Sequence, residues 1–553
     1  MKQATARGVT ALLLGVGGAL ALLFSGPPSP RPASAPVAEF SAERAMRHVE
    51  AIARAPHPLG SDEHDRVRDY LLSALGELGL EGVIQKTTGF TAKYRARGTV
   101  ENVVAHVAAA PDKLPGALML VAHYDSVATG PGAADDGSGV AAILETLRAL
   151  RTGPALRHDL IVLFTDGEER GLLGASAFVA EHPYAKDVRI AINLEAREQS
   201  GASTLFETSS GNASLVADAA RPTDLSGSSL AYEIYKRMPN DTDVTVFKGA
   251  GMQALNFAFV GGWAAYHTLG DDPAHLDRGS LQQQGSYALG LARGLGGRPF
   301  PDIAREDAVF FSFPLGGFVH YGPSVGLMLA GLAALMFVFA AGRSMRAGLA
   351  SARGVGGGFL LFFTSILVVA VLGFAAMATV RALHGTILQS ADVARNAPYA
   401  VTLVTLTAGV TLALVALARQ KLSADDISLG VAGALVILAG ASSVAGASYL
   451  FVWPALALSG VVGASRTTAG DESPRNVMMG VASALPGLLI LVPLVRAVYE
   501  GLGLGGAGGP AVAVVVALVV LSLAQALSVF LGARVPYAAS MIMPKAAIPF
   551  DRS

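Results

Sequence analysis

The pattern of apolar and polar positions divides the chain into three parts. An apolar stretch from about residue 9 to residue 24 follows Lys2 and Arg7, as in a signal peptide or a signal anchor. We favour an N-terminal signal anchor at residues 1–25, followed by a linker rich in Pro, Ser and Ala at residues 26–39. Residues 40–315 mix helical and strand-like patterns and read as a soluble domain.

Within residues 40–315, helical periodicity covers the ranges 41–53, 61–80 and 281–295. Continuous apolar runs, typical of strands buried on both faces, lie at 118–122, 160–164 and 190–194. Strand-like runs and helical patterns alternate from residue 99 to residue 295. This alternation predicts an α/β fold of three layers, with a mixed, largely parallel sheet between helices.

The composition changes after about residue 321, where long apolar segments begin. Most are close to the ~20 residues that cross a bilayer core; they lie at 322–342, 356–380, 398–418, 428–446, 449–465, 477–498 and 511–533. They predict an all-α transmembrane domain at 322–534 with about seven spans, and a cytoplasmic tail at 535–553. The pair 428–446 and 449–465 is too long for one span and slightly short for two, so both alternatives stay open.

Basic residues indicate how the chain crosses the membrane. With the N-terminus inside and both members of the pair spanning, 12 Lys and Arg residues lie in short inside segments and 3 lie outside. This predicts eight spans in total, an inside C-terminus and an extracytoplasmic soluble domain. The Ala- and Gly-rich composition suggests a bacterial source, which would place the protein in the inner membrane with the soluble domain in the periplasm.

The overall composition supports a membrane protein and excludes some chemistries. The chain is 52% hydrophobic and 15% charged, against a usual charged fraction of about 25%. Its formal net charge of -1 argues against a nucleic acid partner and leaves the lipid bilayer as the expected one. Without cysteine, the chain has no disulfide, thiolate nucleophile or Cys-ligated zinc. The oligomeric state does not follow from the sequence.

Acidic and histidine residues follow the predicted strands, at the sheet edge where functional groups collect in open α/β folds. In chain order these are His123, Asp125, Asp135, Glu168, Glu169 and Glu195, with His267 further on. A hydrolytic site with two metals needs imidazoles, carboxylates, a bridging group and a separate carboxylate as base. Each residue alone would more often lie in a solvated loop, but the whole set in this order predicts a metal site.

The order of these motifs resembles the co-catalytic di-zinc peptidases of clan MH, the aminopeptidase and glutamate carboxypeptidase II type. The motifs are His123-Tyr-Asp-Ser, Ala134-Asp-Asp-Gly-Ser-Gly, Glu168-Glu-Arg-Gly-Leu-Leu-Gly-Ala, Asn193-Leu-Glu and Tyr266-His-Thr. With several C-terminal spans, the chain is most similar to the membrane branch, which holds endoplasmic reticulum metallopeptidase (Felix-ina) and the fungal vacuolar membrane protease. The resemblance covers about residues 40 to 300 by motif, and the rest by architecture.

The resemblance implies a site for two Zn²⁺ ions. His123, Asp135 and Glu195 would hold one ion. Asp135, Glu169 and His267 would hold the other, so that Asp135 bridges the two. Most soluble members carry Asp at the position of Glu195, and this longer side chain would approach its metal from a shifted backbone or bind it differently.

The resemblance also implies roles for residues that bind no metal. Glu168 would be the general base and acid, and Asp125 would orient the imidazole of His123. In the family, the peptide bond after the bridging aspartate is often cis. Asp241, Asp243 and Tyr266 are candidate substrate contacts, although a capped turn or aromatic packing explains them about equally well.

The predicted function is that of a membrane-anchored zinc exopeptidase, most simply an aminopeptidase, that hydrolyses peptide substrates with a metal-activated water. Two alternatives remain open. One is a degenerate peptidase domain that serves as a binding or assembly module, and the other is a glutaminyl cyclase-like acyl transferase with one zinc. A zinc content of two, one or none would separate the three.

Overall fold

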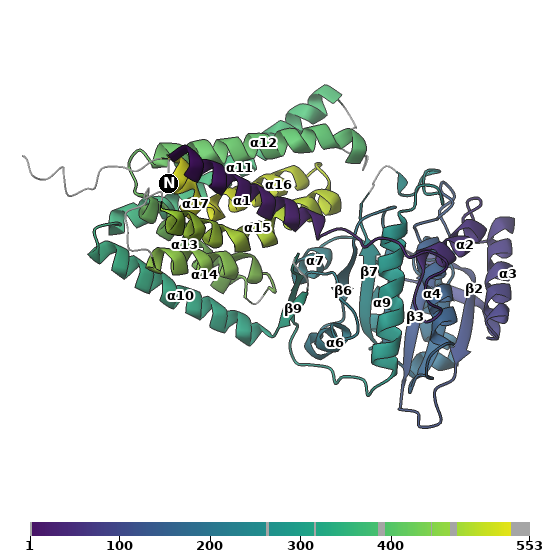
Figure 1. Ribbon diagram of the computed structural model, residues 1–553. Coiled ribbons are helices and arrows are strands. Elements are labelled where there is room, and N and C mark those ends of the chain that lie inside the picture. The colour runs from purple at the N-terminus through teal and green to yellow at the C-terminus, as the bar shows by residue number, and fades with distance from the viewer. Residues whose placement is uncertain are drawn as a thin grey trace, which may run out of the picture.

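The computed structural model describes residues 3–261, 265–314, 317–384, 393–443, 445–464 and 473–531. It consists of an α/β domain and a bundle of long helices, and these two parts lie end to end (Figure 1). The predicted tail at 535–553 lies outside the described residues.

A seven-stranded sheet forms the centre of the α/β domain, in the order β1-β2-β4-β3-β5-β7-β6. The strands are β1 Gly82–Thr91, β2 Ala96–Val107, β3 Ala117–His123, β4 Asp159–Thr165, β5 Val188–Ala196, β6 Ser203–Thr208 and β7 Gln253–Phe259. All but β2 and β6 point in one direction, and β4, β3, β5 and β7 pair in parallel. The predicted mixed, largely parallel sheet is therefore confirmed.

Alternate residues of the central strands pack on opposite helix layers. Leu118 and Leu120 of β3 lie in one core, and Met119 and Val121 lie in the other. The first layer includes α2 Ala42–Ile52, α3 Asp62–Glu77, α4 Gly137–Leu150, α6 Ala213–Ala219 and α9 Arg278–Gly296, and the second includes α5 Leu173–Glu181, η1 Pro183–Lys186 and α8 Asp243–Gly249. Because both faces of each central strand are covered, their sequences are apolar without interruption.

A short hairpin, β8 Val309–Ser312 and β9 Phe318–Tyr321, joins the two parts of the molecule. Its side chains alternate between two cores: Phe310 packs in the α/β core, and Val309 and Phe311 pack among the membrane helices. The Phe311 ring stacks on Tyr449, with ring centroids 4.4 Å apart. The two parts therefore share a packed interface that includes buried aromatic side chains.

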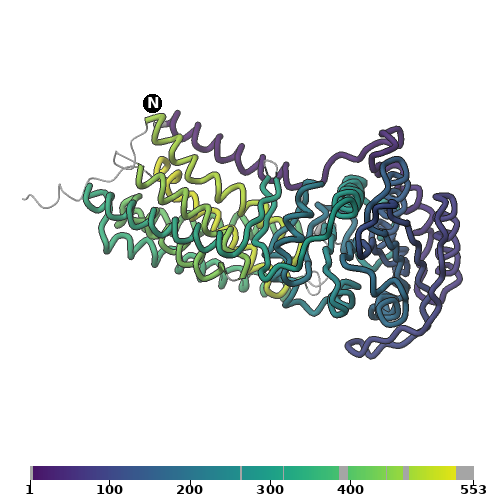
Figure 2. The backbone as a smooth tube through the Cα atoms, turned by 90° about the horizontal axis from the view of Figure 1, so that it is seen from below, coloured from purple at the N-terminus to yellow at the C-terminus, as the bar shows by residue number. Residues whose placement is uncertain are grey.

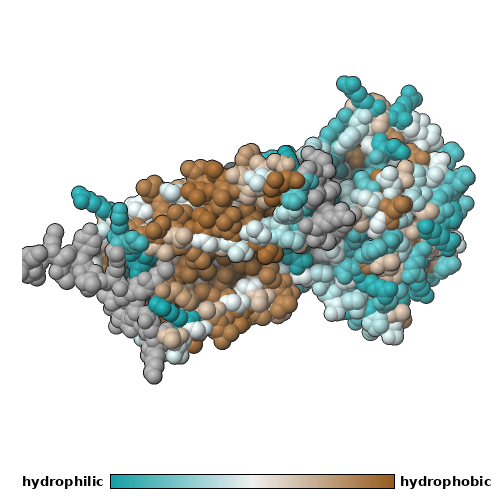
Figure 3. All heavy atoms as spheres, turned by 90° about the horizontal axis from the view of Figure 1, so that it is seen from above, coloured by the Kyte–Doolittle hydropathy of each residue, from teal (hydrophilic) through white to brown (hydrophobic). Residues whose placement is uncertain are grey.

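The membrane part presents a continuous hydrophobic surface beside the polar α/β domain (Figure 3). Its helices are α1 Gln3–Leu23, α10 Pro323–Arg346, α11 Ala352–His384, α12 Val393–Ala418, α13 Ala424–Ala441, α14 Tyr449–Ala464, α15 Pro474–Leu502, α16 Gly508–Ser522 and α17 Ala524–Leu531. Among the described residues, six helices are long and apolar enough to cross a membrane: α1, α10, α11, α12, α13 and α15.

Two features bear on the predicted count of eight spans. The single span expected at 511–533 is a pair, α16 and α17, bent by 67°. The 16 residues of α14 extend about 24 Å, less than the ~30 Å of a hydrocarbon core. Eight spans require both the bent pair and α14 to cross, and this topology stays a prediction.

The N-terminal helix α1 runs along α15, although the two are far apart in the sequence (Figure 2). Gly17 of α1 faces Leu485 and Leu488 of α15. The chain then leaves the helix bundle and passes to the surface of the α/β domain.

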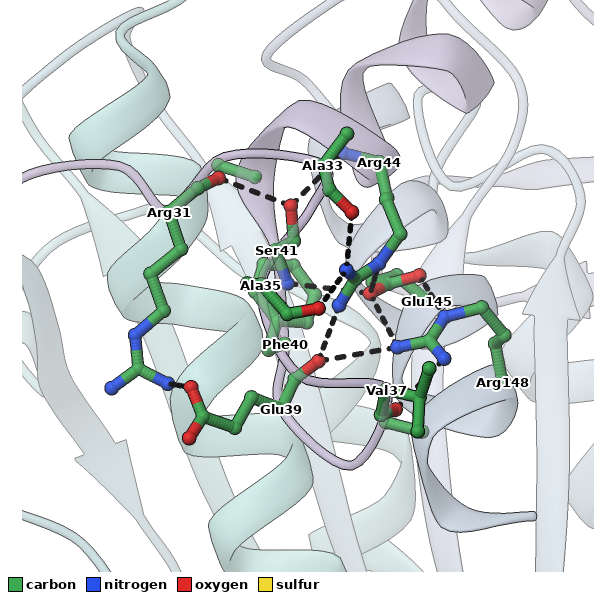
Figure 4. Close-up of polar contacts among 12 residues, drawn as sticks. Arg31, Ala33, Ala35, Val37, Glu39, Phe40, Ser41, Arg44, Glu145 and Arg148 are labelled. Atoms are coloured by element: carbon green, nitrogen blue, oxygen red, sulfur yellow. Dashed lines mark hydrogen bonds and ion pairs between the residues drawn. The ribbon is translucent and has the colours of Figure 1, made fainter. Parts of the chain in front are cut away.

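A buried ion pair fixes the segment that follows α1 to the α/β domain (Figure 4). Nε of Arg44 in α2 donates to Oε1 of Glu145 in α4 at 2.7 Å, and their side chains are 9% and 1% exposed. The same guanidinium donates to the backbone carbonyls of Ala33 and Ala35 at 2.8 and 2.9 Å. The second half of the predicted linker is therefore held against the domain by directed hydrogen bonds.

We expect Arg44→Ala to lower the free energy of unfolding by about 3 kcal/mol, because it leaves the buried Glu145 carboxylate with Arg148 as its remaining cationic partner. The control is Arg31→Ala, since the Arg31–Glu39 pair is exposed and should contribute less than about 1 kcal/mol. Chemical denaturation of the purified full chain in detergent measures both changes. Equal losses of stability in the two variants would show that the buried Arg44–Glu145 pair contributes no more than the exposed Arg31–Glu39 pair.

Candidate active site

The predicted site residues meet at the carboxyl edge of the parallel strands. His123 ends β3, Glu195 is next to last in β5, and the Glu168–Glu169 pair lies just beyond β4. Asp135 comes from the loop that leads into α4, and His267 from the segment after β7. Adjacent parallel strands end at the same edge, which brings together side chains that are up to 144 positions apart in the sequence.

Asp135 lies between the two histidines. Its Oδ1 is 3.1 Å from Nε2 of His123, and its Oδ2 is 3.2 Å from Nε2 of His267. Oε2 of Glu195 lies 3.8 Å from the His123 nitrogen, and Oε1 of Glu169 lies 3.1 Å from the His267 nitrogen. Two triads result, each with its ligand atoms within 4.8 Å of one another, and they share Asp135.

These donors fit zinc. Ligand atoms about 2.1 Å from a tetrahedral zinc ion lie about 3.4 Å apart, close to the spacings within the two triads. Oε1 of Glu169 is buried, and its 3.1 Å contact with Nε2 of His267 does not have the geometry of a hydrogen bond. Burial raises the pKa of Glu195 to about 8 and also raises the pKa values of Glu168 and Glu169. A cluster of acids this hard to ionise together is stabilised by bound cations.

Asp125 connects the His123 ring with the turn that carries the two glutamates. Its carboxylate accepts from the backbone N–H groups of Glu168 and Glu169 at 3.0 and 3.3 Å. Nδ1 of His123 lies 2.9 Å from the backbone carbonyl oxygen of Asp125 and 3.6 Å from its carboxylate. The carbonyl therefore contacts the ring directly, while the carboxylate holds the turn. Glu168 belongs to neither triad and lines the cavity at the site.

Sequence reasoning missed Asp271, which supports the loop of Asp135. The Asp271 carboxylate is buried and accepts from the backbone N–H groups of Ala134 at 2.8 Å and Asp135 at 3.3 Å. The following peptide bond, between Asp135 and Asp136, is cis, as the resemblance implied. The signal available in the sequence was an acid four residues after His267.

We expect Asp271→Ala to weaken zinc binding by about 10–100-fold, because two backbone N–H groups would lose their acceptor and Asp135 its position. The control is Asp272→Ala, which removes the neighbouring acid at the surface and should leave the affinity unchanged. Titration of the metal-stripped full chain with zinc measures both. An unchanged affinity in Asp271→Ala would show that the loop holds Asp135 without this contact.

The structure separates the three candidate substrate contacts. Asp241 and Tyr266 line the cavity, whereas Asp243 is buried, is not among the lining residues and accepts from Oγ1 of Thr165 at 2.5 Å. The hydroxyl of Tyr94 donates to Asp241 at 2.7 Å. The Tyr266 ring stacks on the imidazole of His267, with centroids 3.8 Å apart. The cavity itself measures about 840 Å³, in the upper range of ligand pockets.

Residues 102–292 match the sequence model of Peptidase family M28. The match covers about a third of the chain. Over 288 residues the chain is 31% identical to a vacuolar membrane protease of Lachancea thermotolerans, covering 48% of this chain and 29% of the relative. Over 329 residues it is 28% identical to endoplasmic reticulum metallopeptidase 1 of Homo sapiens, covering 53% and 36%. The chain thus matches about a third of the length of these relatives.

Among solved structures, an aminopeptidase from Aneurinibacillus sp. strain AM-1 aligns with 49% of this chain and 98% of its own length, at 14% identity and a TM-score of 0.40. The family match and the membrane relatives confirm the predicted resemblance. The match to the M28 model and the six apolar helices support a multi-pass membrane protein with a peptidase-like domain. The roles of its individual residues stay predictions.

Proposed function

We propose that the protein is a membrane-embedded exopeptidase with two Zn²⁺ ions, and specifically an aminopeptidase. The observation that carries this proposal is the position of Asp135, whose two carboxylate oxygens face different histidines. A carboxylate shared by two ligand triads is what a two-metal hydrolytic site requires. An acyl transferase with one zinc would not need both triads.

In this proposal His123 and Glu195 complete one zinc site, and Glu169 and His267 complete the other. Bound zinc would supply Lewis-acid chemistry, lowering the pKa of water toward ~7 and polarising a peptide carbonyl. The Glu168 carboxylate would accept a proton from the attacking water and donate it to the leaving amine.

Two residues on the cavity wall support action at the amino end of a peptide. Asp241 supplies a carboxylate of the sign that a substrate α-ammonium group requires, and this group would compete with Lys93, which pairs with Asp241 in the structure. Tyr266 places an aromatic ring beside His267, where it would contact the terminal residue.

The test uses the purified full chain in detergent. We expect two zinc ions per chain by elemental analysis, cleavage of a peptide with a free amino terminus, and no cleavage of its N-acetylated form. Removal of zinc with a chelator should abolish cleavage, and added zinc should restore it. One zinc with cyclisation of N-terminal Gln would favour the acyl transferase, and no zinc would favour a binding module.

The proposed location follows from the distribution of basic residues. We propose that the M28 domain lies on the extracytoplasmic side, which is the periplasm if the source is bacterial as the composition suggests. The relatives named above come from a yeast and from human. A reporter fused after Ser553 should read as cytoplasmic, and an external signal would refute the eight-span topology.

A further inference from the structure

The cavity at the metal site lies between the M28 domain and the membrane helices. On one side it is lined by Asp135, Glu168 and Glu195 of the site. On the other side its lining comes from α15, including Ile490 and Leu494. The peptidase domain alone therefore does not enclose the space in which a substrate would bind.

The α15 side of the cavity combines apolar side chains with one ion pair. Ile490, Pro493 and Leu494 line the cavity, and so do Arg496 and Glu500, which form an ion pair at 2.7 Å in the last turns of the helix. At a rise of 1.5 Å per residue, Ile490 lies about 9 Å along the helix from Arg496. With this charged pair at the level of the lipid head groups, Ile490 would lie at the boundary between head groups and acyl chains.

Apolar residues from other elements complete this part of the cavity. They are Phe24 after α1, Leu230 and Ile234 of α7 (Ser229–Tyr235), and Phe311 and Phe313 at β8. A substrate segment that extends from the metal site in this direction would meet apolar side chains from the N-terminal region, the M28 domain and the membrane domain.

Contacts between the domains fix the position of this apolar region. Oγ of Ser228, which caps α7, lies 2.9 Å from the hydroxyl of Tyr449. Oγ of Ser229 donates to the backbone carbonyl of Gly446 at 2.6 Å. The α7 side of the cavity is therefore hydrogen-bonded to Gly446, in the loop before α14, and to Tyr449, the first residue of α14, and these bonds fix its position relative to the membrane helices.

We propose that α15 forms a substrate subsite that binds an apolar stretch of a membrane-associated peptide while the scissile bond lies at the metal site. This inference rests on the proposed peptidase function and adds the substrate class. It differs from a preference for one terminal residue, because the subsite contacts residues several positions away from the scissile bond. Peptides that carry an apolar segment at the bilayer surface would gain these contacts, and polar peptides would not.

The test compares two peptides with the same residues around the scissile bond and either an apolar or a polar stretch further along. With the full chain in detergent, we expect kcat/KM to be at least about tenfold higher for the apolar peptide. Leu494→Asn should raise KM for the apolar peptide by about tenfold, with kcat and the polar peptide unchanged. Leu494→Ala is a second variant that introduces no polar group and should act in the same direction.

The matched control is Leu485→Asn, on the same helix and outside the cavity lining. It should leave the ratio between the two peptides unchanged, and because micelle binding of the peptides is common to all variants, the ratio isolates the subsite. Equal cleavage of both peptides, or a loss in Leu494→Asn that is the same for both, would overturn the subsite and leave the peptidase function intact. A zinc-loaded chain that cleaves neither peptide would instead refute the proposed function.

Discussion

Glu168→Gln is expected to lower turnover by about 10²–10⁴-fold while both zinc ions stay bound. Glutamine keeps the shape of the side chain but cannot accept the proton. Glu168 lines the cavity outside both triads, so its replacement removes no ligand. In contrast, Glu169→Gln should lose zinc and activity together, since Glu169 belongs to the triad of His267.

Zinc content and turnover are measured together on each purified variant. Glu50→Gln, at an exposed position in α2, serves as the control for a change from Glu to Gln and should match the unmodified chain in both. A fully active Glu168→Gln, or one that loses zinc, would reverse the roles assigned to the two adjacent glutamates.

His267→Ala is expected to reduce the zinc content from two ions per chain to one and to abolish most activity. The triad of His267 would keep only two carboxylates, whereas the triad of His123, Asp135 and Glu195 remains complete. Elemental analysis after gel filtration measures the stoichiometry, and a peptide assay measures the activity.

His275→Ala is the matched control, because His275 lies eight residues further along and its exposed side chain pairs with Asp272. It should retain two ions and full activity. Loss of both ions in His267→Ala would show that the two sites fill only together, and retention of both would remove His267 from the ligand set.

The sequence predicted the strands that are buried on both faces and the helices whose buried and exposed positions alternate regularly. The runs that became β3, β4 and β5 are apolar throughout because helices cover both faces of the sheet. The helices α2 and α9 followed from their periodicity, since α2 buries one face and the residues of α9 that stay exposed or half-buried share one face. By contrast, β1 lies at the edge of the sheet with most of its residues exposed or half-buried, so its sequence carries no strong pattern.

The clustering of the candidate site residues was predictable because the motifs sit at strand ends and because their order resembles a known family. Asp271 was not predicted, since its contacts with Ala134 and Asp135 join segments that are far apart in the sequence. The contribution of Leu494 to the cavity was not predicted for the same reason: its periodic, apolar surroundings read only as a membrane span. Packing between domains leaves little trace in local sequence patterns.

The contact between α1 and α15 has a consequence for how the chain is made. Roughly 450 residues separate the two helices, which takes about 20 to 90 s at the usual rates of protein synthesis. During that interval α1 sits in the bilayer without its partner helix. All five proposed zinc ligands emerge before α15 does, so a nascent chain can bind metal before its substrate cavity is enclosed. The cavity can therefore be enclosed only when synthesis of the membrane domain is nearly complete.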